Sequence, residues 1–145
     1  MGGASPDRTP GPGGSDRAGR DPHGRNVELA FLEGVRARLP GHPAVLESLG
    51  CLYTELGRHE EGLQADREMV RLQPASPLAW YNLACSLSLT GQPDEAFEAL
   101  EKAISLGYAD AEWMQEDDDF APIRSDPRFG RLLARLMVEI GRAHV

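Results

Sequence analysis

The chain has 145 residues, enough for one domain and a tail, and it carries a formal net charge of −8 at pH 7. A chain this acidic disfavours nucleic acid and anionic membrane surfaces as partners, because like charges repel. It also lacks an apolar run of signal-peptide or membrane-span length, and we therefore expect a cytoplasmic protein.

Residues 1–25 are predicted to form a disordered tail rich in Gly and Pro. They contain almost no apolar side chains, so burial cannot offset the entropy lost on ordering them. The arginines of this segment are interleaved with Asp7, Asp16 and Asp21, which argues against a basic arm for nucleic acid.

The folded domain is predicted to span residues 26–145 and to begin with an amphipathic helix over residues 26–40. Asn26 is suited to the N-cap position. Four apolar residues at four-residue spacing define one stripe of this helix: Val27, Phe31, Val35 and Leu39. We interpret this segment as the second helix of an incomplete repeat that caps the array.

Four helices are predicted next, over residues 43–56, 58–72, 77–89 and 93–106. The last two form the clearest pair, because their apolar residues recur at three- and four-residue intervals on either side of Gly91-Gln92-Pro93. Gly91 is suited to end one helix and Pro93 to begin the next. This pattern predicts an antiparallel helical hairpin that needs a similar neighbour to bury its apolar face.

That neighbour lies 34 residues upstream, so residues 43–76 and 77–110 are predicted to be two repeats. Leu49 and Gly50 align with Leu83 and Ala84, and Gly57 aligns with Gly91. With a closing Pro74, this period and pattern resemble the tetratricopeptide repeat family.

Two residues depart from the family pattern. Asp66 replaces an aromatic residue, which predicts looser packing of its helix, and Gly107-Tyr108 replaces the closing Pro of the second repeat. The second departure indicates that the array ends there.

Residues 111–145 are predicted to form a degenerate third unit and a capping helix. A short helix would bring Trp113 onto the second repeat, and the carboxylates of residues 117–119 would form a solvated turn. The capping helix begins at Asp126-Pro127 and ends before Gly141. Its apolar residues are Phe129, Leu132, Leu133, Leu136, Met137 and Ile140. The residues from Trp113 to Phe129 also resemble the segment that closes some bacterial repeat arrays.

No pattern for catalysis or for a metal site emerges from the sequence. The four histidines lack metal-ligand spacing, and residues 117–119 lack the alternating ligands of a calcium loop. We therefore expect a protein that is not an enzyme, with no cofactor and no metal.

The family resemblance implies an all-α fold, a right-handed superhelix of antiparallel helix pairs with capping helices at both ends. It also implies a concave groove lined by the first helix of each pair. The side chains expected to face this groove are Glu47, Cys51, Thr54, Leu78, Tyr81, Asn82, Cys85, Ser88, Glu112 and Glu116.

The groove residues suggest a protein-interaction module or scaffold that binds a protein or peptide segment. Tyr81, flanked by Glu47 and Glu112, favours a basic peptide. Some family members clamp the carboxylate of chaperone tails with Lys, Asn, Asn, Lys and Arg. Here those places hold Glu47, Cys51, Asn82, Glu112 and Glu116, which argues against that ligand.

Two alternatives remain open at this point. The chain is either a structural protein that forms a homo-oligomer through an end face or the capping helix, or a regulatory subunit of a separate enzyme.

Cys51 and Cys85 occupy equivalent places on neighbouring first helices. Such places are roughly 8–10 Å apart, whereas a disulfide needs Cα atoms within about 7 Å. We therefore expect two free thiols, both open to a small alkylating reagent.

Overall fold

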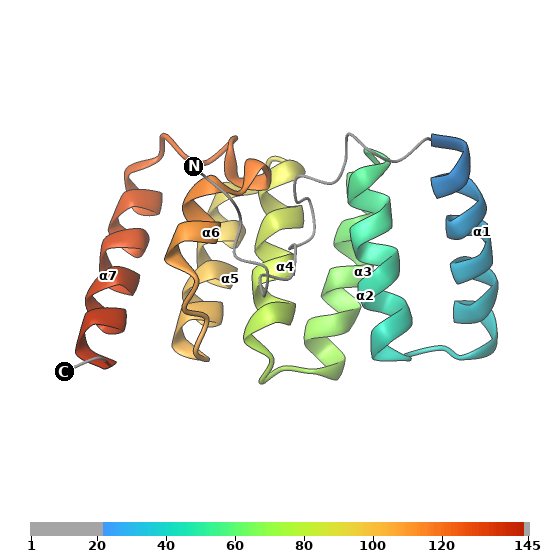
Figure 1. Cartoon of the computed structure of the whole chain (residues 1–145), viewed down its shortest axis with the longest axis horizontal. Helices are drawn as coiled ribbons and strands as arrows, with labels where there is room; N and C mark the ends of the chain where they lie inside the picture. The colour runs from blue at the N-terminus through green and yellow to red at the C-terminus, as the bar shows by residue number, and fades with distance from the viewer. Residues whose placement is uncertain (1–21, 144–145) are drawn as a thin grey trace, which may run out of the picture.

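The computed structural model describes residues 22–143, and helices and their connecting turns make up this part of the chain (Figure 1). The α-helices are α1 (Pro22–Arg38), α2 (Pro43–Glu55), α3 (His59–Leu72), α4 (Pro77–Leu89), α5 (Pro93–Ser105), α6 (Ala111–Glu116) and α7 (Pro127–Ala143). A short 3-10 helix, η2 (Asp118–Phe120), follows α6.

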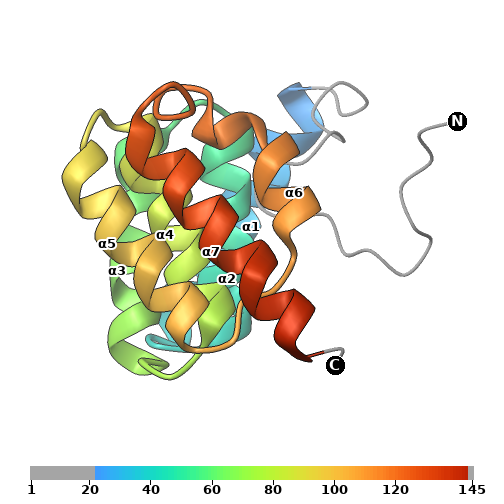
Figure 2. The ribbon, with the colours of Figure 1, turned by 90° about the vertical axis from the view of Figure 1, so that its left-hand side faces the viewer.

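Successive helices pack against one another in chain order, from α1 on α2 to α4 on α5. Figure 1 shows the resulting row of helices, with α1 at one end and α7 at the other. In the end-on view of Figure 2, α3 and α5 lie on one side of the array and α6 on the other. The expectation of an all-α array of helix pairs is confirmed.

Equivalent turns close the two hairpins. Gly57 and Gly91 have φ angles of 76° and 74°, in the left-handed region that favours glycine. At the start of α4 the hydroxyl of Ser76 accepts a hydrogen bond from the backbone N–H of Ala79, as an N-cap should. The 34-residue spacing of the two glycines is thus a property of the fold.

Small residues lie where the paired helices cross. In the second repeat Ala84, Ala96 and Ala103 are fully buried. In the first repeat a Cβ added to Gly50 would lie 2.8 Å from Oδ1 of Asp66. The expectation of loose packing at Asp66 is therefore wrong, because the carboxyl group takes the space that a bulkier pair of residues would fill.

The first helix differs from the prediction in its start and in its buried face. It begins at Pro22, so residues 22–25 are helical, while the rest of the predicted tail lies outside the described residues. The side chain of Arg25 is buried and donates a hydrogen bond to the backbone carbonyl of Glu55, which attaches the first turn to α2.

Leu29 is the buried apolar residue of α1, and Leu32 packs beside it against α2. The predicted stripe points elsewhere: Val27, Phe31 and Leu39 are 58%, 69% and 52% exposed. The face of α1 that carries Leu29 is buried because its polar residues also form hydrogen bonds and an ion pair with α2 and α3. Glu33 accepts a hydrogen bond from the hydroxyl of Tyr53, and Arg36 pairs with Glu68.

The C-terminal part follows the predicted order with one correction. Trp113 is half-buried against the main core, and α7 begins at Pro127 as expected, but it continues through Gly141 to Ala143. The predicted solvated turn is wrong, because Asp117 and Asp119 are buried. Across residues 22–143, no helix is both long enough and apolar enough to cross a membrane.

Substitution at the tight crossing of α4 and α5 tests this packing. Ala96→Leu is expected to cost roughly 1–3 kcal/mol of unfolding free energy, because Ala96 is fully buried and the added carbons overpack the site. Glu98→Leu, at an exposed position of the same helix, should change it little. Urea denaturation of both variants measures the difference, and equal effects would contradict the assignment of the buried face.

Candidate binding surface

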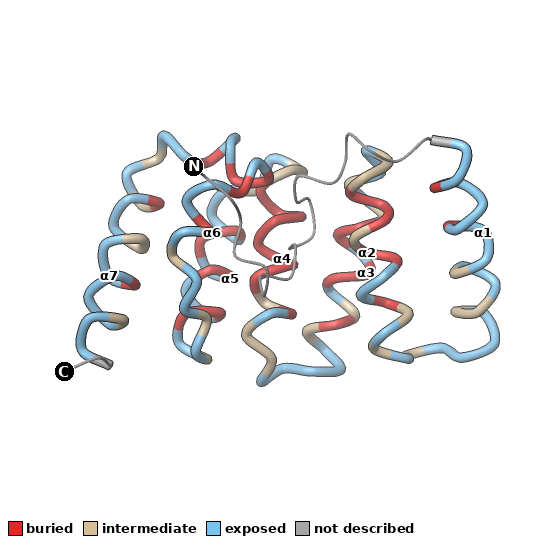
Figure 3. The backbone as a smooth tube through the Cα atoms, viewed as in Figure 1, coloured by how far each residue is buried: buried red, intermediate tan, exposed pale blue. Residues whose placement is uncertain are grey.

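Helix α4 is buried along most of its length, with every residue from Tyr81 to Ser88 shielded from solvent (Figure 3). Helices α3 and α5 cover two of its sides. The remaining side is covered by residues 108–124, which include α6 and η2 and which we name the closing segment. The predicted groove wall of the second repeat is therefore an internal contact in this structure.

The ring of Tyr81 is the centre of that contact. It stacks on Tyr108 with ring centroids 4.4 Å apart, and it meets Phe120 edge-on at 5.4 Å. Phe120 in turn packs against Phe129 of α7 at 5.8 Å. Aromatic contacts thus connect α4 to the closing segment and to the capping helix.

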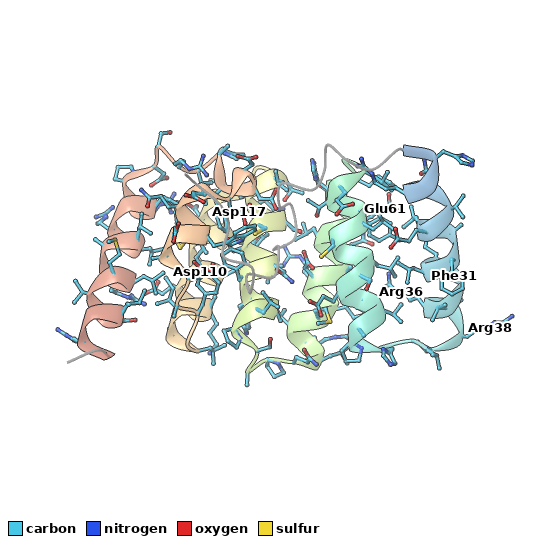
Figure 4. All side chains as sticks on the ribbon, viewed as in Figure 1. Phe31, Arg36, Arg38, Glu61, Asp110 and Asp117 are labelled. Carbon is cyan, nitrogen blue, oxygen red and sulfur yellow. The ribbon has the colours of Figure 1, made fainter. Side chains whose placement is uncertain are left out.

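Asp117 supplies the polar part of the same contact and lies between α6 and α4 (Figure 4). Its Oδ2 accepts a hydrogen bond of 2.7 Å from the hydroxyl of Tyr81, and Cys85 Sγ lies 3.8 Å from the same oxygen. Its Oδ1 accepts the backbone N–H of Asp119, whose carbonyl accepts the hydroxyl of Ser88 at 2.7 Å. Burial and the neighbouring carboxylates raise the pKa of the Cys85 thiol.

Cys85, Asp117 and Asp119 place one potential metal-ligand atom each within 4.8 Å of one another, and all three residues are buried. The two carboxylate oxygens of Asp117 already accept hydrogen bonds from Tyr81 and from the backbone of Asp119. We therefore assign the cluster a structural role in attaching the closing segment.

The ten predicted groove residues divide into two groups. Glu47, Leu78, Glu112 and Glu116 are exposed, and Cys51 is partly exposed. The buried residues are Thr54, Tyr81, Asn82, Cys85 and Ser88. The expectation that these five face an open groove is wrong for this structure. Tyr81, Cys85 and Ser88 contact the closing segment, and the hydroxyl of Thr54 donates to the carbonyl of Gly50 in its own helix.

We name the exposed residues of α2, α4 and α6 the acidic face. These helices and η2 contain no Lys or Arg, while α2 and α6 supply two glutamates each and η2 two aspartates. Burial raises the pKa of the Cys51 thiol to about 12, with further contributions from Asp66, Glu47, Glu55 and Asp119. Carboxylates of the first repeat and of the closing segment thus act on one thiol.

Asp66 forms the polar connection between the two repeats. It is 5% exposed, and its Oδ2 accepts a hydrogen bond of 2.5 Å from the hydroxyl of Ser86 in α4. Burial raises the pKa of Asp66 to about 7, an effect that the hydrogen bond from Ser86 opposes and the charge of Asp119 reinforces. A carboxyl group that holds a proton near neutral pH therefore lies inside the array.

Sequence reasoning missed the residues that cover α4. Tyr108, Asp117, Asp119 and Phe120 complete the contact around Tyr81, yet the run of carboxylates was interpreted as a surface turn. The signal that points to them is the resemblance of residues 113–129 to an array-closing segment.

Comparison with known families supports the repeat assignment. Residues 77–109 match the family model described as tetratricopeptide repeat, so the segment predicted as the second repeat carries this motif. No curated protein matches the chain.

Asp66 is expected to make stability fall as the pH rises from about 4 to 7. Across this window the folded state keeps a proton that the unfolded chain, with an ordinary pKa of 3.8, releases. Each pH unit should remove up to about 1.4 kcal/mol, and the loss should level off above pH 7. Asp66→Asn should lack this pH-dependent loss of unfolding free energy. The stability of the variant relative to the wild type should therefore increase as the pH rises.

Urea denaturation at several pH values measures the difference, with the exposed Asp118→Asn as control. Parallel stability curves for wild type and Asp66→Asn would contradict the assignment.

The two cysteines are free, as expected, but they differ in accessibility. Native protein should react with iodoacetamide slowly at Cys51, because its raised pKa leaves little thiolate at pH 8. Cys85 is 2% exposed and should react only after unfolding. Peptide mass spectrometry after timed labelling reads both sites, and Cys85 modification as fast as that of Cys51 would show that the closing segment leaves α4 uncovered.

Proposed function

Because the chain carries a tetratricopeptide repeat, we propose that it is a protein-interaction module whose acidic face binds a basic peptide segment of a partner protein. The tetratricopeptide repeat suggests protein partners in general. The basic character of the ligand rests on one observation, which is that α2 and α6 carry two glutamates each while α2, α4 and α6 contain no Lys or Arg.

The distribution of basic residues elsewhere supports this proposal. Arginines lie on α1, α3 and α7, where several of them pair with acids of the same or neighbouring helices. Arg67 pairs with Glu95, and Arg135 pairs with Glu101. The helices of the acidic face therefore present no positively charged side chain to a basic ligand. Arg124 of the closing segment is engaged with the backbone carbonyl of Asp117.

Leu78 gives the acidic face an apolar contact point. It is 45% exposed at the start of α4, on the helix that lies between α2 and α6 in the repeat order. A peptide that combines Lys or Arg with an apolar side chain would match this combination of glutamates and leucine. Tyr81 has no part in this site, because its ring is only 1% exposed.

We also propose that the protein has no catalytic activity of its own. Asp66 and Cys85, two of the groups whose pKa values are raised, are buried inside the array and have polar partners there. They have structural partners, which accounts for their burial without a reaction.

Fluorescence anisotropy with labelled twelve-residue peptides of basic, neutral and acidic composition tests the proposed ligand class. The basic peptide should bind, and its affinity should fall as salt is raised, because the contacts are exposed to solvent. Glu47→Gln and Glu112→Gln should each weaken binding by about twofold to fivefold, in the range of single exposed charge contacts.

Glu98→Gln is the matched control, because Glu98 is an exposed glutamate on α5, outside the acidic face. Equal loss of affinity in Glu98→Gln would point to attraction by net charge alone and would contradict the proposed site. Stronger binding of the neutral or acidic peptide would contradict the proposed ligand.

A further inference from the structure

The outer side of α1 carries a row of apolar residues that no other described helix covers. Phe31 is 69% and Val27 58% exposed, and Figure 4 shows Phe31 and Arg38 at the end of the array, on the side of α1 away from α2. A hollow of about 330 Å³ lies on this side, lined by Ala30, Phe31, Gly34, Val35 and Arg38. We name these five residues together with Val27 the α1 patch.

Gly34 forms the floor of the hollow. A Cβ built at this position would have nothing within 4 Å, so the glycine leaves open space beside the exposed ring of Phe31. Glycine inside a helix is less favourable than alanine, and packing among residues 22–143 does not require a glycine here. The exposed ring of Phe31 thus lies about one helical turn from the open space above Gly34.

The α1 patch is also symmetric along the helix. Val27, Phe31, Gly34 and Arg38 are spaced by four, three and four residues, a sequence of steps that reads the same in both directions. If two copies of α1 lie antiparallel about a two-fold axis between residues 32 and 33, Phe31 of each copy faces Gly34 of the other. Val35 then faces Ala30, so a large residue meets a small one in both of these central pairs.

We propose that the α1 patch is the contact surface of a homodimer in which Phe31 of each copy fills the hollow over Gly34 of the other. This proposal is independent of the acidic face, which lies on other helices.

Charge is compatible with this pairing. The whole chain has a net charge of −8, but α1 has three arginines against two glutamates. The antiparallel arrangement places Arg38 opposite Val27 of the other copy, next to Glu28, and holds the two copies of Arg38 at opposite ends of the contact. Attraction between unlike charges thus favours this orientation.

The size of the contact predicts a weak dimer. The 17 residues of α1 span about 25 Å, and one face of such a helix buries on the order of 400 Å² per copy. This is about half of the roughly 800 Å² that each partner buries in a standard interface. We therefore expect dissociation in the micromolar range.

Sedimentation velocity from about 1 to 500 μM protein, in reducing buffer, tests the proposal. The wild type should shift from monomer to dimer and no further, because a two-fold contact is closed. Phe31→Glu should raise the dissociation constant at least tenfold. Gly34→Gln should do the same by filling the hollow, while leaving the thermal midpoint unchanged or higher, so unfolding cannot account for the loss.

Met137→Glu is the control at the opposite end of the array, since Met137 of α7 is 60% exposed. It should leave the dimer intact. A wild-type protein that stays monomeric at 500 μM overturns the proposal, as does a dimer that survives Phe31→Glu or assembly into larger species. Loss of the dimer in Met137→Glu alone would assign the contact to α7 and would equally overturn it.

Discussion

The burial of α4 on all sides is the constraint on which the rest of the structure depends. A helix without a solvent-facing side has to be covered from every direction, and α3, α5 and the closing segment do this together. Tyr81 makes the contact with the closing segment specific. Its buried hydroxyl needs a hydrogen-bond acceptor, and its ring packs best against other aromatic rings. Asp117 and Tyr108 meet both needs.

This constraint also shapes the proposed binding surface. Because the closing segment occupies the inner side of α4, the residues that stay accessible are those at its edge, such as Leu78, and those on α2 and α6. The buried carboxyl of Asp119 adds to the negative potential of that surface, since it contributes with Glu47 and Glu55 to the raised pKa of Cys51. Packing and electrostatics therefore have a common origin in how α4 is covered.

The sequence predicts the helix pairs well, since glycine and proline turns and apolar spacing are local signals. It predicts the environment of single residues less well. In α1 two overlapping stripes satisfy helical spacing, and only the partners of Glu33 and Arg36 across the interface decide for the one with Leu29. Asp117 is a similar case, because its buried partner, Tyr81, lies 36 residues away in the sequence.

The way α4 is covered limits how such an array can be lengthened by design. A further repeat appended at the C-terminus would have to displace the closing segment and would leave the hydroxyls of Tyr81 and Ser88 without their acceptors. A copy of residues 77–110 inserted between the two repeats would instead preserve that end. Of the two new junctions, one would place Asp66 against a copied Ser86. At the other junction the copied Leu100, which is equivalent to Asp66, would lie against the hydroxyl of the original Ser86. The copied Tyr81 and Ser88 would also lie away from Asp117 and Asp119, which accept their hydroxyls in the last repeat. An inserted repeat therefore needs apolar residues at these two positions, and alanine in place of the serine at the second junction.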